Sequence, residues 1–235
     1  MYKNKKIAVV IPCYKVSKFI NKVIFDLPNF IDRIYLIDDA CPEKSLKKII
    51  SNSKKIKKVF RDFNGGVGAA VKDGYRYSLK DKNHITVRID GDGQMDLKLI
   101  KFFIDPIINK KAEFTKGNRF TNMTFLRKMP ILRIIGNIFF SIIGNIMIKN
   151  FTIFDFLNGY TCINNHALKK VLKKNLDNDF FFDTSLIYQL SESKIKILDI
   201  PMKAKYENEK SNINVFKTGL SFLYKNLIFF LGIKK

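Results

Sequence analysis

Two aspartates with one glycine between them follow an apolar, strand-like segment in VRIDGDGQMD (87–96). In an extended segment, side chains two residues apart point to the same side, so the carboxylates of Asp90 and Asp92 can meet one ligand. Gly91 removes side-chain bulk, which lets that ligand approach the backbone. Two carboxylates and the amide of Gln94 suit Mg²⁺ or Mn²⁺ that shares phosphate oxygens. The pattern favours a metal–phosphate site, and the alternative is a turn in which Asp and Gly only satisfy the backbone.

Two further polar motifs follow strand-like segments. Asp38-Asp39 ends the run RIYLIDD, where carboxylates can accept hydrogen bonds from a ribose or a base. Asn64-Gly65-Gly66 opens a helical segment and is similar to a phosphate-binding turn at a helix N-terminus, although it lacks the GxGxxG spacing and the Walker lysine. A solvated strand end and close helix–sheet packing are the respective alternatives.

Strand and helix signals alternate along the chain. Strands are expected at 7–12, 33–38, 58–62, 84–90, 112–117, 159–163 and 194–202, and helices at 18–27, 42–50, 67–79, 97–108, 121–150, 165–174, 182–192 and 214–231. This alternation predicts an α/β fold with a mostly parallel central sheet flanked by helices. Ligands bind beyond the carboxyl ends of the strands in such sheets, so the three motifs are expected to converge on one cleft.

The composition is that of a globular protein with a strong positive charge. The 235 residues are 46% apolar and 27% charged, which excludes a disordered chain, and the net charge of +22 favours anionic partners. Cys13, Cys41 and Cys162 have neither metal-ligand nor disulfide spacing, so a reduced, cytoplasmic setting is expected. The N-terminal segment reads as a first strand rather than a signal peptide, and no segment offers the ~20 apolar residues of a membrane span.

An ordered set of segments resembles family 2 glycosyltransferases, in the branch of dolichyl- and polyprenyl-phosphate sugar synthases. The segments are IPCYKVSKFI, IDDACPEKS, NGGVGAAVKDGYRYSL, DGDGQMD, KGNRF, RIIGN, DFLNGYTCI and FFFDTSLI. The resemblance covers roughly residues 5–210 and implies a GT-A nucleotide-diphospho-sugar transferase fold. It also implies inverting transfer from a UDP- or GDP-linked sugar to a lipid-linked or glycan acceptor. Lys15 stands where the family usually has Asn, and Ala40-Cys41 where Gly-Ser or Ala-Ser is usual.

The resemblance also implies roles for individual residues. Asp90 and Asp92, with Gln94, would hold Mg²⁺ or Mn²⁺, and Arg133 would make a second phosphate contact on the acceptor side. The residues implied for nucleotide-sugar binding are Pro12, Tyr14, Asp39, Asn64, Gly66, Asp90, Gly91, Asp92 and Arg119.

Two further acids, Asp155 and Asp183, are implied as catalytic residues. A metal and an arginine stabilise the charge on a departing nucleoside diphosphate, and a carboxylate base activates a hydroxyl acceptor. A phosphate acceptor is already anionic and does not need that base. A capping or ion-pairing role is the alternative for either acid.

The resemblance divides the chain into a GT-A domain at 1–210 and a C-terminal amphipathic helix at 211–235. Within the domain, residues 1–118 would bind the nucleotide sugar and 119–210 the acceptor. In the predicted helix before residue 150, one polar stripe consists of residues four apart, Arg133, Asn137, Ser141 and Asn145. An interfacial helix with its apolar face in a bilayer is expected, and a core helix is the alternative.

The C-terminal helix adds a second apolar side with basic residues near it. The apolar residues are Phe216, Leu220, Leu223, Leu227 and Phe230, and the lysines expected to meet lipid phosphates are Lys217, Lys225, Lys234 and Lys235. These features predict an enzyme that is peripheral on the inner face of the cell membrane, with an anionic membrane surface as partner. A homo-oligomer in which this helix forms the interface is the alternative.

Three other function classes are weaker. A sugar-nucleotide nucleotidyltransferase would have a Gly-rich, basic segment after the first strand, where this chain has PCYKVSK. The charge permits nucleic-acid binding, but the sequence has no recognised nucleic-acid module, so no nucleic-acid partner is expected. An inactive homologue serving as an assembly subunit is disfavoured by the retained Asp90, Asp92 and Arg119.

Overall fold

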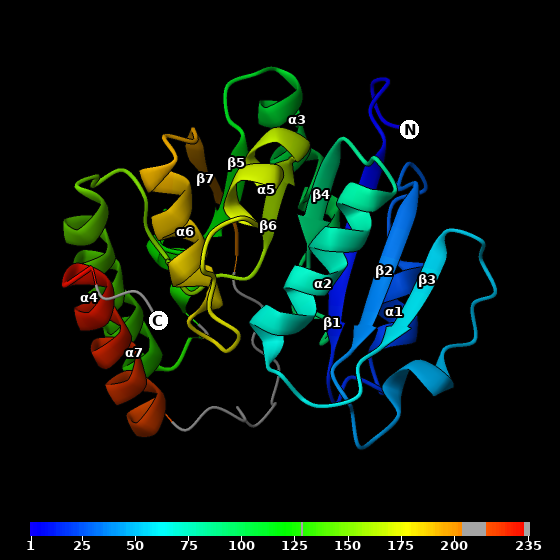
Figure 1. Cartoon of the computed structure of the whole chain (residues 1–235), viewed down its shortest axis with the longest axis horizontal. Helices are drawn as coiled ribbons and strands as arrows, with labels where there is room; N and C mark the ends of the chain where they lie inside the picture. Colours follow the sequence, from blue (N-terminus) through cyan, green and yellow to red (C-terminus); the bar gives the residue numbers. More distant parts are fainter. Residues whose placement is uncertain (128, 204–214, 233–235) are drawn as a thin grey trace.

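The computed structural model describes residues 1–127, 129–203 and 215–232, and it has one seven-stranded sheet flanked by helices (Figure 1). The strand order is β3-β2-β1-β4-β6-β5-β7. The strands are β1 (Ile7–Cys13), β2 (Arg33–Asp38), β3 (Ile56–Phe60), β4 (Ile85–Arg88), β5 (Phe114–Asn118), β6 (Thr161–Asn164) and β7 (Ile197–Pro201). β6 runs antiparallel to both β4 and β5, whereas every other pairing is parallel, which confirms the expected mostly parallel sheet.

Apolar side chains on both faces of the sheet are buried under helices. One core joins the sheet to α1 (Ile20–Phe25) and α3 (Ile100–Ile108). The other joins it to α2 (Val67–Lys80), α5 (Asn165–Val171) and α6 (Phe182–Glu192). β1 is buried from Ile7 to Ile11 because it lies in the middle of the sheet between β2 and β4, where both of its faces are covered.

The sheet brings the predicted motifs to one edge. β1, β2, β4, β5 and β7 all end there, and antiparallel β6 begins there. Since β6 lies between β4 and β5, strands from both halves of the predicted domain share one continuous sheet.

Two helix predictions were wrong in extent. Residues 42–50 form only a short 3-10 turn, η1 (Ser45–Lys48), because Lys44 is left-handed and the Ser45 hydroxyl accepts a hydrogen bond from Val16 N (3.2 Å) instead of supporting a helix. The helix expected at 121–150 begins only after Pro130, since a proline disfavours helical geometry at the residue before it. The 3-10 turn η3 (Met123–Leu126) precedes α4 (Ile131–Ile148). The 3-10 turn η2 (Leu97–Leu99) precedes α3 in the same way.

α4 is amphipathic with its polar side facing inward. Asn137, Ser141 and Asn145 are buried, so the polar stripe faces the protein. The exposed residues of α4 include Ile131, Leu132, Ile135, Phe139, Ile142 and Ile146. Within the described part of the chain, α4 is the one helix whose length and composition would allow it to cross a membrane.

The C-terminal helix α7 (Val215–Phe230) packs beside α4 at one end of the molecule (Figure 1). Its buried side includes Phe222 and Asn226, and Asn226 accepts a hydrogen bond from the Tyr188 hydroxyl. Leu220, Leu223, Leu227 and Phe230 are exposed on the other side, as expected. The predicted boundary at residue 210, the side chains of Phe216 and Lys217, and residues Lys234 and Lys235 lie outside what the structure describes.

One prediction for α7 was wrong. The Lys225 ammonium was expected to meet lipid phosphates, but it donates to Asp177 Oδ1 and Asp179 Oδ2, both at 2.6 Å. The side chain of Lys225 is only 13% exposed. Lys225 therefore fastens α7 to the loop that leads into α6.

Candidate active site

The loop after β4 holds Asp90 and Asp92 in a tight turn. Gln94 N donates to Asp92 Oδ1 (3.0 Å), and Gly93 has φ +77°, a left-handed backbone that suits glycine. The side chain of Asp90 is 35% exposed, and Asp92 and Gln94 are half-buried. Asp90 and Asp92 thus lie close to the surface, on a loop held by its own hydrogen bonds.

The side chains of Asp90, Asp92 and Gln94 suit an open site for a hard divalent cation better than a closed structural metal site. In the described ranges, no three His, Cys, Asp or Glu side chains group closely enough to form a metal cage. Two carboxylates and an amide suit a hard cation that takes its remaining ligands from water and phosphate. The loop therefore fits Mg²⁺ or Mn²⁺ shared with a diphosphate, and not a closed structural metal site.

Asp39 joins two of the predicted motifs. Its carboxylate accepts hydrogen bonds from Gly65 N (3.0 Å) and Gly66 N (2.9 Å), and it pairs with Arg61. Gly66 has φ +92°, and a Cβ there would lie 2.5 Å from Asn178 O, so this position requires glycine. Asp39 thus has a structural role in the glycine turn, and its contact with a nucleoside stays a prediction.

The other residues predicted on the nucleotide side lie at the same edge. Pro12 lies opposite Ile37, one residue before the end of the β1–β2 pairing. Tyr14, just after β1, is 42% exposed. Asn64 Oδ1 accepts from Gly66 N (3.1 Å). Gly91 packs against Val16, because a Cβ added to Gly91 would lie 3.2 Å from Val16 Cγ2. The backbone is left-handed at Lys15, which departs from the family pattern, and at Ala40, which precedes the departing Cys41, with φ of 56° and 50°.

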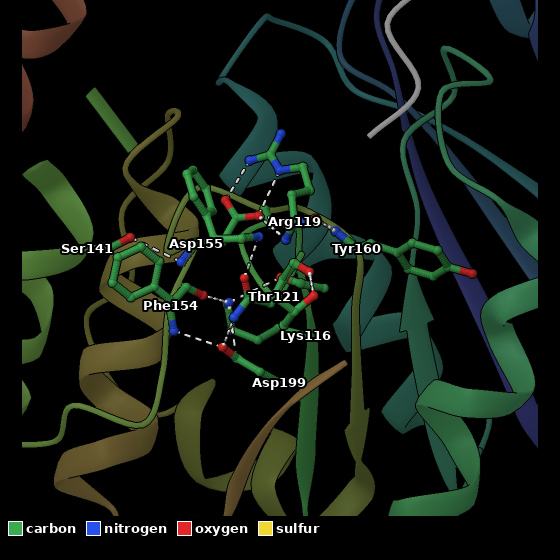
Figure 2. Close-up of polar contacts among 12 residues, drawn as sticks. Lys116, Arg119, Thr121, Ser141, Phe154, Asp155, Tyr160 and Asp199 are labelled. Carbon is green, nitrogen blue, oxygen red and sulfur yellow. Dashed lines mark hydrogen bonds and ion pairs between the residues drawn. The ribbon is translucent and has the colours of Figure 1, made fainter. Parts of the chain in front are cut away.

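Arg119, which follows β5, is held by a wholly buried carboxylate (Figure 2). Asp155 Oδ2 accepts from Arg119 N (3.0 Å) and Nε (2.7 Å), and Oδ1 accepts from Nη2 (2.6 Å). Asn158 Nδ2 adds a fourth hydrogen bond (3.1 Å). Burial alone would raise the pKa of Asp155, but the Arg119 guanidinium lowers it below its ordinary value. Asp155 is therefore a fixed anion that orients Arg119.

A second buried ion pair supports this site, and sequence reasoning missed it (Figure 2). The Lys116 side chain has no exposed surface, and its ammonium donates to Phe154 O and to Asp199 Oδ1 (3.3 Å). Asp199 Oδ2 accepts from Asn118 Nδ2 (2.7 Å) and Phe154 N (2.8 Å). The pair fastens the segment before Asp155 to β5 and β7. A lysine within the buried run AEFTKGN was the available signal.

Asp183 lies in the first turn of α6 and pairs with Arg88, the last residue of β4. Burial raises the pKa of Asp183 to about 6, the nearby Asp90 charge adds to this, and Arg88 opposes it. A carboxylate with such a pKa is suited to accept a proton near neutral pH. Arg88 was missed in the sequence, although an arginine inside a buried strand is itself unusual.

Arg133 is half-buried in the first turn of α4. Two turns further along the same stripe, the Ser141 hydroxyl accepts a hydrogen bond from Asp155 N (3.0 Å). The stripe therefore faces the Arg119–Asp155 pair, while the phosphate contact of Arg133 stays a prediction.

Comparisons with known proteins found relatives that match most of the chain. The family model described as "Glycosyl transferase family 2" matches residues 8–190. The UDP-N-acetylglucosamine–dolichyl-phosphate N-acetylglucosaminyltransferase of Methanococcus voltae is 25% identical over 246 residues, which cover 97% of this chain and 98% of that protein. An uncharacterized protein of Methanocaldococcus jannaschii is 23% identical over 94% of this chain and 90% of its own length.

Solved structures show the same fold at low sequence identity. Glucosyl-3-phosphoglycerate synthase from Mycobacterium tuberculosis, in complex with Mn²⁺, UDP and phosphoglyceric acid, gives a TM-score of 0.69 at 12% identity. The match covers 99% of this chain and 80% of that one. The fold is the GT-A fold that the sequence predicted, and the family match favours the glycosyltransferase class over a nucleotidyltransferase. The chain belongs to glycosyl transferase family 2.

Proposed function

We propose that this glycosyltransferase is metal-dependent and inverting, and that it moves a sugar from a UDP- or GDP-linked donor to a polyprenyl phosphate or lipid-linked glycan. One observation carries the proposal: the Asp90–Asp92 loop and the Arg119–Asp155 pair lie at one edge of the sheet, joined through Gly159 and Asn158. A Cβ on Gly159 would lie 3.1 Å from Asp90 Oδ2, and the preceding Asn158 bonds Asp155.

The donor would lie across this edge. Asp90 and Asp92, with Gln94, hold Mg²⁺ or Mn²⁺, which when bound offsets the charge of the departing nucleoside diphosphate. Arg119 adds a fixed positive charge aimed by Asp155. The nucleoside side consists of Pro12, Tyr14, Asp39, Asn64, Gly66 and Gly91. The Mycobacterium tuberculosis protein crystallised with Mn²⁺ and UDP, or with Mg²⁺ and UDP, supports this choice of ligands.

The two predicted catalytic acids take different roles in this proposal. Asp183, with its pKa raised to about 6, accepts the proton of a hydroxyl acceptor. Both oxygens of Asp155 already accept hydrogen bonds from Arg119, so Asp155 acts as a positioning residue. A phosphate acceptor would need no base, and the Asp183 carboxylate would then serve only to position its neighbours.

The acceptor side supports a lipid-linked substrate at a bilayer. α4 and α7 are in contact, and both expose apolar residues, which are together named the apolar face: Ile131, Leu132, Ile135, Phe139, Ile142, Ile146, Leu220, Leu223, Leu227 and Phe230. A soluble helix normally buries its apolar side, whereas α4 buries asparagine and serine and exposes isoleucine and phenylalanine. Such a surface suits lipid, and the net charge of +22 suits the anionic inner face of a cell membrane. The Methanococcus voltae relative, named for a dolichyl-phosphate acceptor, supports the same choice.

Transfer is tested by incubating the protein with a panel of UDP- and GDP-sugars, Mn²⁺ and either polyprenyl phosphate or a soluble glycan. We expect a glycosylated lipid whose anomeric configuration is the opposite of the donor's. If no donor yields product with any acceptor, the proposal is wrong and the inactive-homologue class remains.

Membrane attachment is tested by sedimentation with anionic liposomes. We expect Phe139→Ser with Ile142→Ser to reduce sedimentation, and removal of all residues after Tyr206 to reduce it further. Phe102→Ser, which changes an exposed phenylalanine of α3 outside the apolar face, is the matched control. Unchanged sedimentation of the apolar-face variants, or a dimer in solution that these variants dissociate, would contradict a bilayer partner.

A further inference from the structure

Arg88 joins the cation loop to α6 from inside the protein. It ends β4, pairs in register with Thr161 of β6, and its side chain is only 3% exposed. Nη1 donates to Asp183 Oδ1, and Nη2 lies 3.4 Å from Asp90 Oδ1. Nε has no hydrogen-bond partner among the described residues, so the two Nη atoms make all of the guanidinium's polar contacts there.

The guanidinium is also fixed by its apolar surroundings. Its Cζ lies 5.7 Å from the centroid of the ring of Phe182, which is the residue before Asp183. On another side, the backbone of Gly159 presses against it, because an added Cβ would lie 2.8 Å from Nη2. Burial alone would lower the pKa of Arg88, but the Asp183 and Asp90 carboxylates raise it above its ordinary value, so the guanidinium keeps its charge.

The two carboxylate oxygens of Asp90 differ in their contact with Arg88. In the part of the chain that the structure describes, Arg88 engages Oδ1 alone, so Oδ2 is available for a cation. The planar fork of arginine can hold two carboxylates at a set separation, whereas lysine presents a single point charge. Asp90 and Asp183 are 93 positions apart in the chain, so a shared guanidinium is what couples their placement.

We propose that Arg88 is a positioning residue, which holds Asp90 of the cation loop and Asp183 of α6 on one guanidinium and so sets where the proton-accepting carboxylate lies relative to the donor diphosphate. This inference rests on the proposed function. It assigns Arg88 no contact with substrate. A misplacement of about 1 Å between reacting groups can cost about 100-fold in rate, so the loss of the fork should appear in kcat.

The experiment compares Arg88→Lys, Asp183→Asn and the double variant with the wild-type protein. Arg88→Lys keeps the buried positive charge but replaces the two Nη atoms, which contact Asp183 and Asp90 separately, with a single ammonium. We expect kcat to fall about 100-fold with donor KM nearly unchanged. Binding of Mn²⁺ with UDP, followed by the electron paramagnetic resonance of Mn²⁺, should persist because Asp92 and Asp90 Oδ2 are untouched. The double variant should be no slower than Asp183→Asn alone, since Arg88 acts through Asp183.

A second variant moves the guanidinium without changing any charge. Gly159→Ala places a methyl group 2.8 Å from Nη2 and 3.1 Å from Asp90 Oδ2, so it crowds the contact between Arg88 and Asp90 and should lower kcat as Arg88→Lys does. Arg33→Lys is the matched control, because its guanidinium is exposed and donates to Lys54 O (2.9 Å), and it should keep wild-type kcat.

Failure of this inference differs from failure of the proposed function. Wild-type protein that neither binds Mn²⁺–UDP nor transfers sugar would refute the proposed function itself. With an active wild-type protein, three results would overturn the role of Arg88: unchanged kcat in Arg88→Lys, losses that multiply in the double variant, or loss of Mn²⁺–UDP binding in Arg88→Lys. Wild-type activity in Asp183→Asn would overturn it too, because no base would then need positioning.

Discussion

Replacing Asp155 with asparagine removes the charge that faces Arg119 while it keeps the size of the side chain. Asp155 has φ 60°, a left-handed backbone that asparagine adopts readily, so backbone strain does not confuse the result. Asparagine retains one acceptor oxygen, but its NH₂ group replaces the other. The NH₂ group and the guanidinium are both hydrogen-bond donors, so they cannot bond to each other. Arg119, whose side chain is 16% exposed, then loses the negative charge of Asp155.

The expected loss in the free energy of unfolding is large for a variant in which an NH₂ group replaces one oxygen. Removing one partner of a buried ion pair costs about 3–5 kcal/mol, and we expect the lower end because Arg119 reaches some water. For a chain of this size, about 3 kcal/mol corresponds to a fall in Tm of roughly 6–12 °C. Sugar transfer should fall as well, since Arg119 is no longer aimed at the diphosphate.

Urea unfolding followed by circular dichroism measures the change. Asp26→Asn is the control, because its exposed pair with Lys22 contributes only about 0.3–0.5 kcal/mol. Arg119 lowers the pKa of Asp155 in the folded state, so the pair's stabilisation is fully present above the unfolded pKa of about 3.9 and disappears as pH falls through the folded value. The gap between wild type and variant should therefore close below about pH 4. A variant as stable as Asp26→Asn at pH 7 would refute the assignment of Asp155 as the anchor of Arg119.

Three further predictions follow from the site. Asp92→Asn should abolish metal-dependent turnover while thermal unfolding stays cooperative; wild-type turnover would exclude Asp92 as a metal ligand. The wild-type kcat/KM for a hydroxyl acceptor should fall below about pH 6, because Asp183 must be ionised to accept a proton, and Asp183→Asn should abolish that limb. Gly66→Ala should weaken nucleotide binding and destabilise the fold by about 1–3 kcal/mol, since φ +92° and the nearby Asn178 O exclude a side chain; unchanged binding would separate this turn from the donor site.

The meeting of the predicted motifs at one edge of the sheet was predictable because these motifs are local. Each motif lies at or within four residues of the carboxyl end of a strand, and parallel strands deliver their carboxyl ends to one edge. Asp39 and the Gly65-Gly66 turn do meet there, at 2.9–3.0 Å. The inward polar stripe of α4 was also predictable, because a spacing of four residues defines one side of a helix.

The pairs that support the site were not predictable in the same way. Arg88 meets Asp183 across 95 positions and Lys116 meets Asp199 across 83, and no periodicity links such residues. The failed helix at 42–50 and the misassigned Lys225 have a similar cause. Ser45 and Lys225 form tertiary contacts that override the local pattern, as their hydrogen bonds to Val16 N and to Asp177 and Asp179 show.

The central claim is that a divalent cation and a nucleotide sugar bind together at the Asp90–Asp92 loop. Calorimetric titration of a UDP- and GDP-sugar panel, with and without Mn²⁺, tests it most directly in the wild-type protein and in Asp90→Asn. We predict that one nucleotide class binds the wild-type protein only with the cation, and that Asp90→Asn loses this binding while it remains folded. Binding that is independent of Mn²⁺, binding that Asp90→Asn retains, or no binding of any member of the panel would contradict the claim.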